Sequence, residues 1–289
     1  MAIYADLHTH TTCSDGLDTP VALLTRARAK GLSVVSITDH DSLAAYPDAR
    51  QTALGLGLEL VTGIEVTTYY NGGSVHILGY FLDESSDAAK KLVEGNNSGR
   101  LDRMHRMLKK ISALGYKVDF AELAAFAGEA TLGRVALARF MVQAGYFKNP
   151  EEAFETALGD NKAGFEPVTS FTPQQAIEFI SEAGGVSSLA HPNEGFDYKS
   201  LEQFAEAGLG AVEAFTPHHG PATRRKWTHW AARLGLAVSG GSDCHGPHFR
   251  NQDVGDAGLD RAMFDELRAR AAMPAREKFA ATGGGNETA

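Results

Sequence analysis

The sequence predicts an α/β fold in which short strands form a parallel sheet or a barrel. Short apolar runs of strand character recur along the 289-residue chain, and segments with helical periodicity separate most of them. This alternation is typical of a parallel sheet or barrel. Histidines and carboxylates follow directly after several of these runs. Since the carboxyl ends of parallel barrel strands meet at one rim, where active sites lie, we expect a functional site there.

Seven runs are the expected strands, at residues 3–7, 33–38, 58–65, 74–82, 186–190, 211–215 and 236–240. The first expected helix is well marked, because Asp18 or Thr19 can cap it, Pro20 suits its first turn and Gly31 can end it. Further helices are expected at residues 172–184, 197–208 and 221–235.

Residues 85–168 show a different pattern, with helix-like stretches at 88–114, 119–127, 131–144 and 150–158 and no strand long enough to pair. We expect residues 1–84 and 169–282 to form the barrel, residues 85–168 to form a helical insertion above its rim, and residues 283–289 to be a flexible tail. His105 falls on a helix rich in Lys and Arg, which favours a solvated surface residue over a metal ligand.

Composition limits the function classes. The formal charge of −9 argues against binding long double-stranded nucleic acid, which needs clustered Lys and Arg. The chain opens directly into the first strand without a basic leader or a long apolar segment, so we expect a cytoplasmic protein that does not bind membranes. Cys13 and Cys244 are expected to be reduced thiols.

The residues after the strands are of the types that bind divalent metals. His8 and His10 share one face of an extended strand, and Asp243 and His245 repeat that spacing. Imidazole nitrogens and carboxylate oxygens together are ligands for such ions. The candidates are His8, His10, Asp15, His40, Glu65, His76, His191, Asp243 and His245.

The charge of these candidates bears on the substrate. Three carboxylates contribute −3, so two divalent ions would leave 4 − 3 = +1 and three would leave 6 − 3 = +3. A site with surplus positive charge attracts an anion such as a phosphate, which favours phosphate chemistry over amide hydrolysis.

Taken together, these motifs resemble the PHP (polymerase and histidinol phosphatase) family over nearly the whole chain. Its first motif corresponds to His8, His10 and Asp15, its second to residues 38–41, and its later motifs to the remaining candidates. The resemblance implies a distorted (β/α)7 barrel with two or three divalent metal ions, manganese being expected first and iron or zinc as alternatives. It implies three ligand sets: His8, His10, Glu65 and Asp243; Glu65, His76 and His191; and Asp15, His40 and His245.

Within that family the chain is similar to a bacterial branch acting on nucleotide phosphates. Residues 131–134, 161–165 and 215–219 carry this similarity. It implies hydrolysis of the 3′-phosphate of nucleoside 3′,5′-bisphosphates to give nucleoside 5′-monophosphates. The alternatives are a 5′-to-3′ exonuclease acting on short RNA, a histidinol phosphate phosphatase, and a metal-stabilised interaction module without catalysis.

Several residues are candidates for substrate contact. Arg134 begins a predicted helix, where a guanidinium and free backbone N–H groups can bind phosphate. His219 follows a strand and is a candidate general acid or phosphate donor, with a reversal of roles with His218 left open. Further candidates for substrate contact are Asn193, Lys162 and Phe165.

Overall fold

The computed structural model describes residues 2–128, 132–167, 170–193, 195–247 and 252–271. Seven strands form one sheet, in which each strand pairs with its neighbour in the sequence. The strands are β1 (Ala5–Asp6), β2 (Val34–Ile37), β3 (Glu59–Tyr70), β4 (Gly73–Tyr80), β5 (Val186–Leu189), β6 (Ala211–Phe215) and β7 (Ala237–Gly240).

The sheet curls until its first and last strands meet. The Leu7 N–H donates to the Gly240 carbonyl at 3.2 Å, and Thr9 and Cys244 form an isolated parallel bridge just beyond the two strands. These contacts make the sheet a nearly closed, distorted seven-stranded barrel. The predicted α/β barrel is confirmed.

The expectation of parallel strands throughout was wrong for β4. This strand pairs antiparallel with both β3 and β5, whereas the other neighbouring pairs are parallel. The reason is the turn at Asn71 and Gly72, whose φ values of 48° and 87° are those of a tight hairpin. Asn-Gly between two apolar runs is a strong hairpin signal, because both residues tolerate positive φ.

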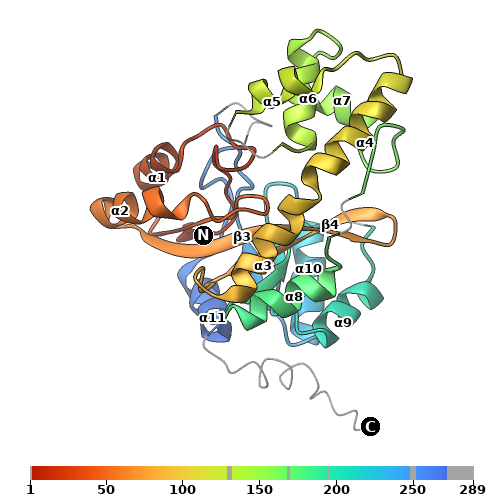
Figure 1. The fold of residues 1–289 in the computed structure, drawn as a ribbon. Helices are drawn as coiled ribbons and strands as arrows, with labels where there is room; N and C mark the ends of the chain where they lie inside the picture. The colour runs from red at the N-terminus through yellow and green to blue at the C-terminus, as the bar shows by residue number, and fades with distance from the viewer. Residues whose placement is uncertain (1, 129–131, 168–169, 194, 248–251, 272–289) are drawn as a thin grey trace.

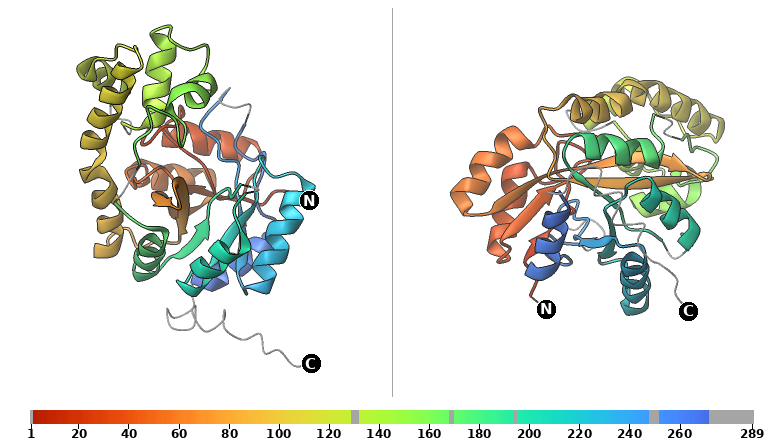
Figure 2. Two further views of the ribbon diagram at one scale, coloured as in Figure 1. Left: turned by 90° about the vertical axis from the view of Figure 1, so that its right-hand side faces the viewer. Right: turned by 90° about the horizontal axis from the view of Figure 1, so that it is seen from below.

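Helices cover the outside of the barrel (Figures 1 and 2). They are α1 (Pro20–Ala29), α2 (Tyr46–Leu56), α8 (Pro173–Glu182), α9 (Tyr198–Glu206), α10 (Pro221–Arg233) and α11 (Arg261–Ala271). Their apolar sides are fully buried against the strands, as for Leu23 on α1 and Ile177 on α8. No helix in the described parts of the chain is long and apolar enough to cross a membrane.

A second group of helices follows β4, and all of them except the first stand above the barrel in Figure 1. The helices that follow β4 are α3 (Asp87–Ser98), α4 (Arg100–Ala113), α5 (Phe120–Ala127), α6 (Arg134–Gln143), α7 (Pro150–Ala153) and the π-helix η1 (Phe154–Leu158). Residues between Met104 and Leu158 form an apolar core of their own.

The single helix expected at 88–114 is two helices, because Gly99 separates α3 from α4 and glycine is a poor helix former. Helix α3 packs on α8 and places Ala89 and Leu92 in the barrel's core. Where the barrel ends and the insertion begins therefore stays a prediction, and the tail expected at 283–289 lies outside the described residues.

Candidate metal centre

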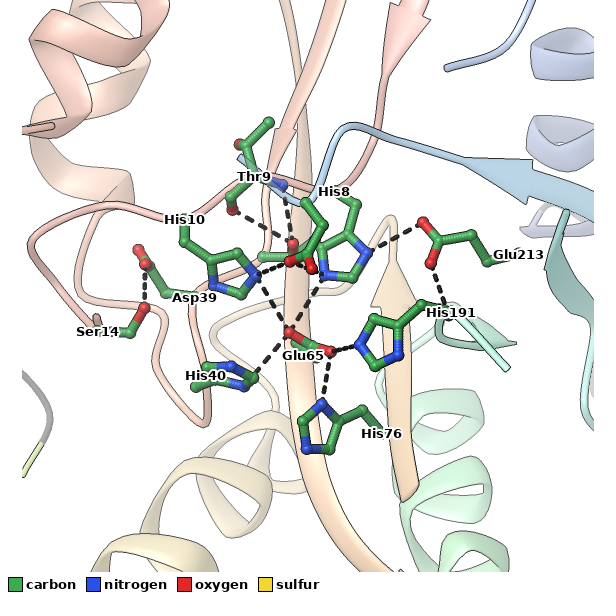
Figure 3. A network of polar contacts seen from close by, with 12 residues as sticks. His8, Thr9, His10, Ser14, Asp39, His40, Glu65, His76, His191 and Glu213 are labelled. Atoms are coloured by element: carbon green, nitrogen blue, oxygen red, sulfur yellow. Dashed lines mark hydrogen bonds and ion pairs between the residues drawn. The ribbon is translucent and has the colours of Figure 1, made fainter. Parts of the chain in front are cut away.

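The nine candidate metal ligands gather in one cluster, in which each has a nitrogen or oxygen within 3.4 Å of another member, and Figure 3 shows part of it. Most follow a strand, as expected, but Glu65 and His76 lie inside β3 and β4. The reason is the length of the β3–β4 hairpin. Strand β3 has 12 residues and continues past the end of its parallel neighbour β2. A residue in the middle of β3 can therefore face the site.

Glu65 is fully buried at the centre of this group. Its Oε2 lies 3.2 Å from Nε2 of His8 and 3.2 Å from Nε2 of His10. The same oxygen lies 3.3 Å from Nδ1 of His40.

The other oxygen of Glu65 faces two more imidazoles. Its Oε1 lies 2.8 Å from Nδ1 of His76 and 3.0 Å from Nε2 of His191 (Figure 3). One carboxylate therefore has both oxygens shared among five rings that come from four different segments of the chain. A carboxylate placed in this way would have one oxygen available to each of two cations.

Asp243 and Asp15 are the other two carboxylates of the group. Asp243 Oδ1 lies 3.4 Å from His8 Nε2 and 3.3 Å from His10 Nε2. Asp15 Oδ1 lies 3.3 Å from His245 Nε2. Both carboxylates are nearly buried, at 7% and 5% exposure for Asp15 and Asp243.

Three sets of donor atoms lie within 4.8 Å of one another: His8, His10, Glu65 and Asp243; His10, Asp15, His40 and His245; and His40, Glu65 and His76. The first set has the membership that the family resemblance implied. The second contains the implied third set and adds His10, and the last has His40 where His191 was implied. The assignment of ligands to individual ions stays a proposal.

The charges of the group favour bound cations. Burial on its own would raise the pKa of Glu65, but the rings of His40 and His8 outweigh it and hold that pKa well below its ordinary value. Asp243 behaves in the same way, because His8 and His245 outweigh its burial and lower its pKa. The carboxylates are therefore ionised.

Unpartnered nitrogens give a direct test of whether ions fit. Both ring nitrogens of His10 and Nδ1 of His40 are buried and make no hydrogen bond of normal geometry within the described residues. A buried nitrogen without a partner is costly, and ligation of a cation removes that cost. The residues present fit divalent metal ions.

Buried carboxylates outside the ligand set hold the loops that carry it. Asp39 accepts hydrogen bonds from the N–H and hydroxyl of Thr11, at 2.7 and 2.6 Å, and from Ser14. Asp6 accepts from the N–H groups of Ser242 and Gly255, and burial raises the pKa of Asp6 to about 6. These bonds position the segments after β1 and β7.

The metal-ligand cluster forms part of the wall of a cavity of about 640 Å³, which is within the size range of small-molecule sites. The cavity continues to the helices above the barrel, where its lining includes Arg100, Arg103, Arg106 and Arg134. The first three were missed from the sequence. Their spacing of three residues along one expected helix places them on a common face, and this was the available signal.

The four guanidinium groups are only partly balanced by nearby carboxylates. Arg100 pairs with Asp41 at 3.0 Å, Arg134 with Asp160 at 2.6 Å and Arg106 with Glu166 at 2.7 Å. Arg103 donates from Nε to the backbone carbonyl of Glu166. Burial, Arg134 and Arg100 together lower the pKa of Arg103 to about 10. A guanidinium held beside like charges in a cavity is suited to binding an anion.

The other expected substrate residues divide into two groups. Arg134 and Asn193 line the cavity, whereas Lys162 is exposed and Phe165 is buried, and neither forms part of the cavity lining. The Phe165 ring packs instead beneath the Arg134 guanidinium, 5.1 Å from it. Phe154, at the start of η1, is the aromatic residue in the lining.

His218 and His219 differ in their surroundings. The ring of His219 is buried, with Nε2 2.9 Å from the Pro192 carbonyl and Nδ1 3.2 Å from the Ala214 carbonyl. Burial lowers the pKa of His219. A neutral imidazole has one N–H, so the neutral ring can donate to one of these two carbonyls. The His218 side chain is 44% exposed, and its Nε2 lies 3.8 Å from Oδ2 of Asp243. Both residues line the cavity, and His218 is the more exposed of the two.

Comparison with known proteins agrees with this geometry. The PHP domain model matches residues 6–199. A 5′-3′ exoribonuclease of Haemophilus influenzae is 32% identical over 84% of this chain and 90% of its own length. A 3′,5′-nucleoside bisphosphate phosphatase of Chromobacterium violaceum is 29% identical over 93% of this chain and 98% of its own length.

A further relative has a different named activity, and a solved structure shares the fold. A phosphoribosyl 1,2-cyclic phosphate 1,2-diphosphodiesterase of Eggerthella lenta is 33% identical over 86% of this chain and 97% of its own length. The crystal structure of a Bifidobacterium adolescentis protein assigned as a metal-dependent phosphoesterase superposes with a TM-score of 0.85 at 29% identity, covering 93% of this chain and 96% of that one. This chain therefore belongs to the PHP domain family.

Proposed function

We propose that this chain, a phosphate-ester hydrolase of the PHP family, removes the 3′-phosphate of nucleoside 3′,5′-bisphosphates and releases nucleoside 5′-monophosphate. One observation carries the proposal: a single cavity joins the metal-ligand cluster to four arginines. A small molecule with two phosphates can then place one phosphate at each end. A bisphosphate phosphatase among the relatives supports the same substrate.

In this proposal the nine candidate residues hold two or three divalent ions, with manganese as our first expectation and iron or zinc as alternatives. Such ions, when bound, polarise a phosphoryl oxygen and lower the pKa of a coordinated water towards about 7. The mixed nitrogen and oxygen donors suit all three metals. Glu65, whose two oxygens face separate sets of imidazoles, would connect the ions.

Side chains of the cavity would bind the substrate and supply a proton to its leaving group. Arg103 and Arg134 would bind the phosphate that is not cleaved and so orient the substrate, because guanidinium groups form paired hydrogen bonds with phosphate oxygens. His218 would give a proton to the 3′ oxygen as the phosphorus–oxygen bond breaks. Its exposed ring beside Asp243 supports this role.

An assay on the manganese-loaded protein that measures both released inorganic phosphate and released mononucleotide tests the proposal. The substrates are a nucleoside 3′,5′-bisphosphate, a 5′-phosphorylated trinucleotide of RNA, and histidinol phosphate. We expect inorganic phosphate from the bisphosphate at the highest kcat/KM. Faster release of mononucleotide from the trinucleotide would favour a 5′-to-3′ exonuclease instead, and activity at background on all three would favour an interaction module.

The exonuclease is the second candidate, because a relative with that name is 32% identical to this chain over most of its length. The two activities need the same metal-ligand cluster and the same second phosphate site. They differ in the phosphate that is cleaved: the phosphatase acts on a phosphomonoester, whereas the exonuclease acts on a phosphodiester that also carries a further nucleotide. The trinucleotide in the assay separates them.

A further inference from the structure

Glu213 is a carboxylate of the barrel interior that is not among the nine candidate ligands. It lies on β6 and is fully buried. Its Oε1 lies 3.0 Å from Nδ1 of His8, and its Oε2 accepts a hydrogen bond of 2.7 Å from the N–H of His191. Figure 3 shows one oxygen of Glu213 directed at the His8 ring and the other directed at the backbone of His191.

The contact with His8 determines which ring nitrogen can bind a metal. A carboxylate at Nδ1 keeps the proton on that nitrogen, so the lone pair is on Nε2. Nε2 of His8 is the atom that faces the cluster, 3.2 Å from Glu65 Oε2 and 3.4 Å from Asp243 Oδ1. Without the carboxylate the ring can exchange tautomers and turn away.

The contact with His191 acts through the backbone. His191 has a φ of 26°, in a region that residues other than glycine rarely adopt. Such a conformation persists only where neighbouring bonds hold it, and the hydrogen bond from its N–H to Glu213 is one of these. This turn directs Nε2 of His191 to within 3.0 Å of Glu65 Oε1.

We propose that Glu213 is a positioning residue for the metal centre, which sets the tautomer of His8 and the backbone turn of His191 together. The inference rests on the metal centre of the proposed function. It predicts that one substitution, at a residue that touches no ion, weakens metal binding on both sides of Glu65. Outer carboxylates of this kind typically change metal affinity by about 10- to 100-fold.

The test compares Glu213→Gln with a matched control, Ser188→Ala. Ser188 is also fully buried in the barrel interior, and its hydroxyl bonds to Ser239 rather than to a candidate ligand. Gln keeps the shape of Glu but faces the His191 N–H or the His8 ring with an amide NH₂. Manganese affinity of chelator-treated protein is measured by titration, with circular dichroism as a check of folding.

We expect Glu213→Gln to bind manganese at least about 10-fold more weakly than the wild type, and Ser188→Ala to bind within about two-fold of it. Equal affinity of Glu213→Gln and the wild type would overturn the inference while leaving the metal centre intact. A wild type that binds no manganese, iron or zinc would overturn the inference and the proposed metal centre together.

A second measurement needs only the wild-type chain and covers the case in which the variant does not fold. The zinc-loaded protein is diamagnetic, so nitrogen chemical shifts of its ¹⁵N-labelled histidines report which ring nitrogen is protonated. We expect His8 to carry its proton on Nδ1 and to bind zinc through Nε2. Zinc bound through Nδ1 of His8 would contradict the role of Glu213.

Discussion

The cavity has two walls that are built in different ways. The barrel wall holds short side chains on strands and on the turns after them, and each contacts several others, as Glu65 does with its five imidazoles. The helical wall holds long arginines, and Arg100 and Arg134 each pair with one carboxylate. The difference teaches that the first wall suits fixed positions for chemistry, whereas the second suits recognition of a variable anion.

The largest effect is expected from Glu65→Gln, which breaks the barrel wall at its centre. Gln cannot supply the charge that faces five imidazoles, so we expect loss of bound metal. The kcat should fall roughly 10³-fold or more, which corresponds to a loss of several kcal/mol of transition-state stabilisation. Phosphate release and metal content by mass spectrometry measure the two effects. Full metal content with unchanged kcat would show that Glu65 does not connect the ions.

His218→Asn and His219→Asn form a matched pair at the edge of the barrel wall. Loss of a proton donor at His218 should lower kcat by about 10²-fold at unchanged stability. His219→Asn should instead lower the free energy of unfolding by about 1–3 kcal/mol, because a buried hydrogen bond to backbone is lost. Steady-state kinetics and urea unfolding separate the two outcomes. A larger kcat effect for His219 would reverse these assignments.

Arg103→Met tests the helical wall. Losing one charged hydrogen-bond donor should raise the KM for a nucleoside 3′,5′-bisphosphate by about 10-fold. The KM for a nucleoside 3′-monophosphate, which lacks the second phosphate, should stay nearly unchanged. Metal content should not change. Lys162→Met is the control, since Lys162 is exposed and does not line the cavity. An equal loss for both substrates would show that Arg103 does not bind the second phosphate.

The smallest effect is expected for Cys244, whose rate of alkylation reports how well the barrel wall excludes solvent and reagents. Burial raises the pKa of this thiol to about 11, so roughly one molecule in a thousand is the reactive thiolate at pH 8. With Cys13→Ser in place, alkylation of Cys244 should be slow at pH 8 and should speed up as the pH rises towards 11. Fast alkylation at pH 8, followed by mass spectrometry, would indicate that this wall opens.

The sequence predicted the barrel wall well because strand ends leave a readable pattern. His8 and His10 alternate with Thr9, and this spacing alone places both rings on one face. Glu65 and His76 were expected after strands but lie inside β3 and β4, since the hairpin signal at Asn71 was not used. Its turn makes β4 antiparallel and brings His76 opposite Thr67.

The helical wall was harder to predict because helix periodicity indicates a face but not what that face meets. Arg134 was identified from its place at a helix start, whereas Arg103 had only its spacing. Phe165 was expected to contact substrate, but it is buried beneath Arg134. Phe154 lines the cavity in its place. Such exchanges depend on the packing of the helices against each other, which a local pattern does not contain.

The most direct test of the two-wall account compares kcat/KM for a nucleoside 3′,5′-bisphosphate and the matching nucleoside 3′-monophosphate on manganese-loaded protein. The account predicts phosphate release that a chelator abolishes, with the bisphosphate favoured by about 10-fold or more. Equal kcat/KM for the two substrates, or release that persists in the chelator, would contradict it.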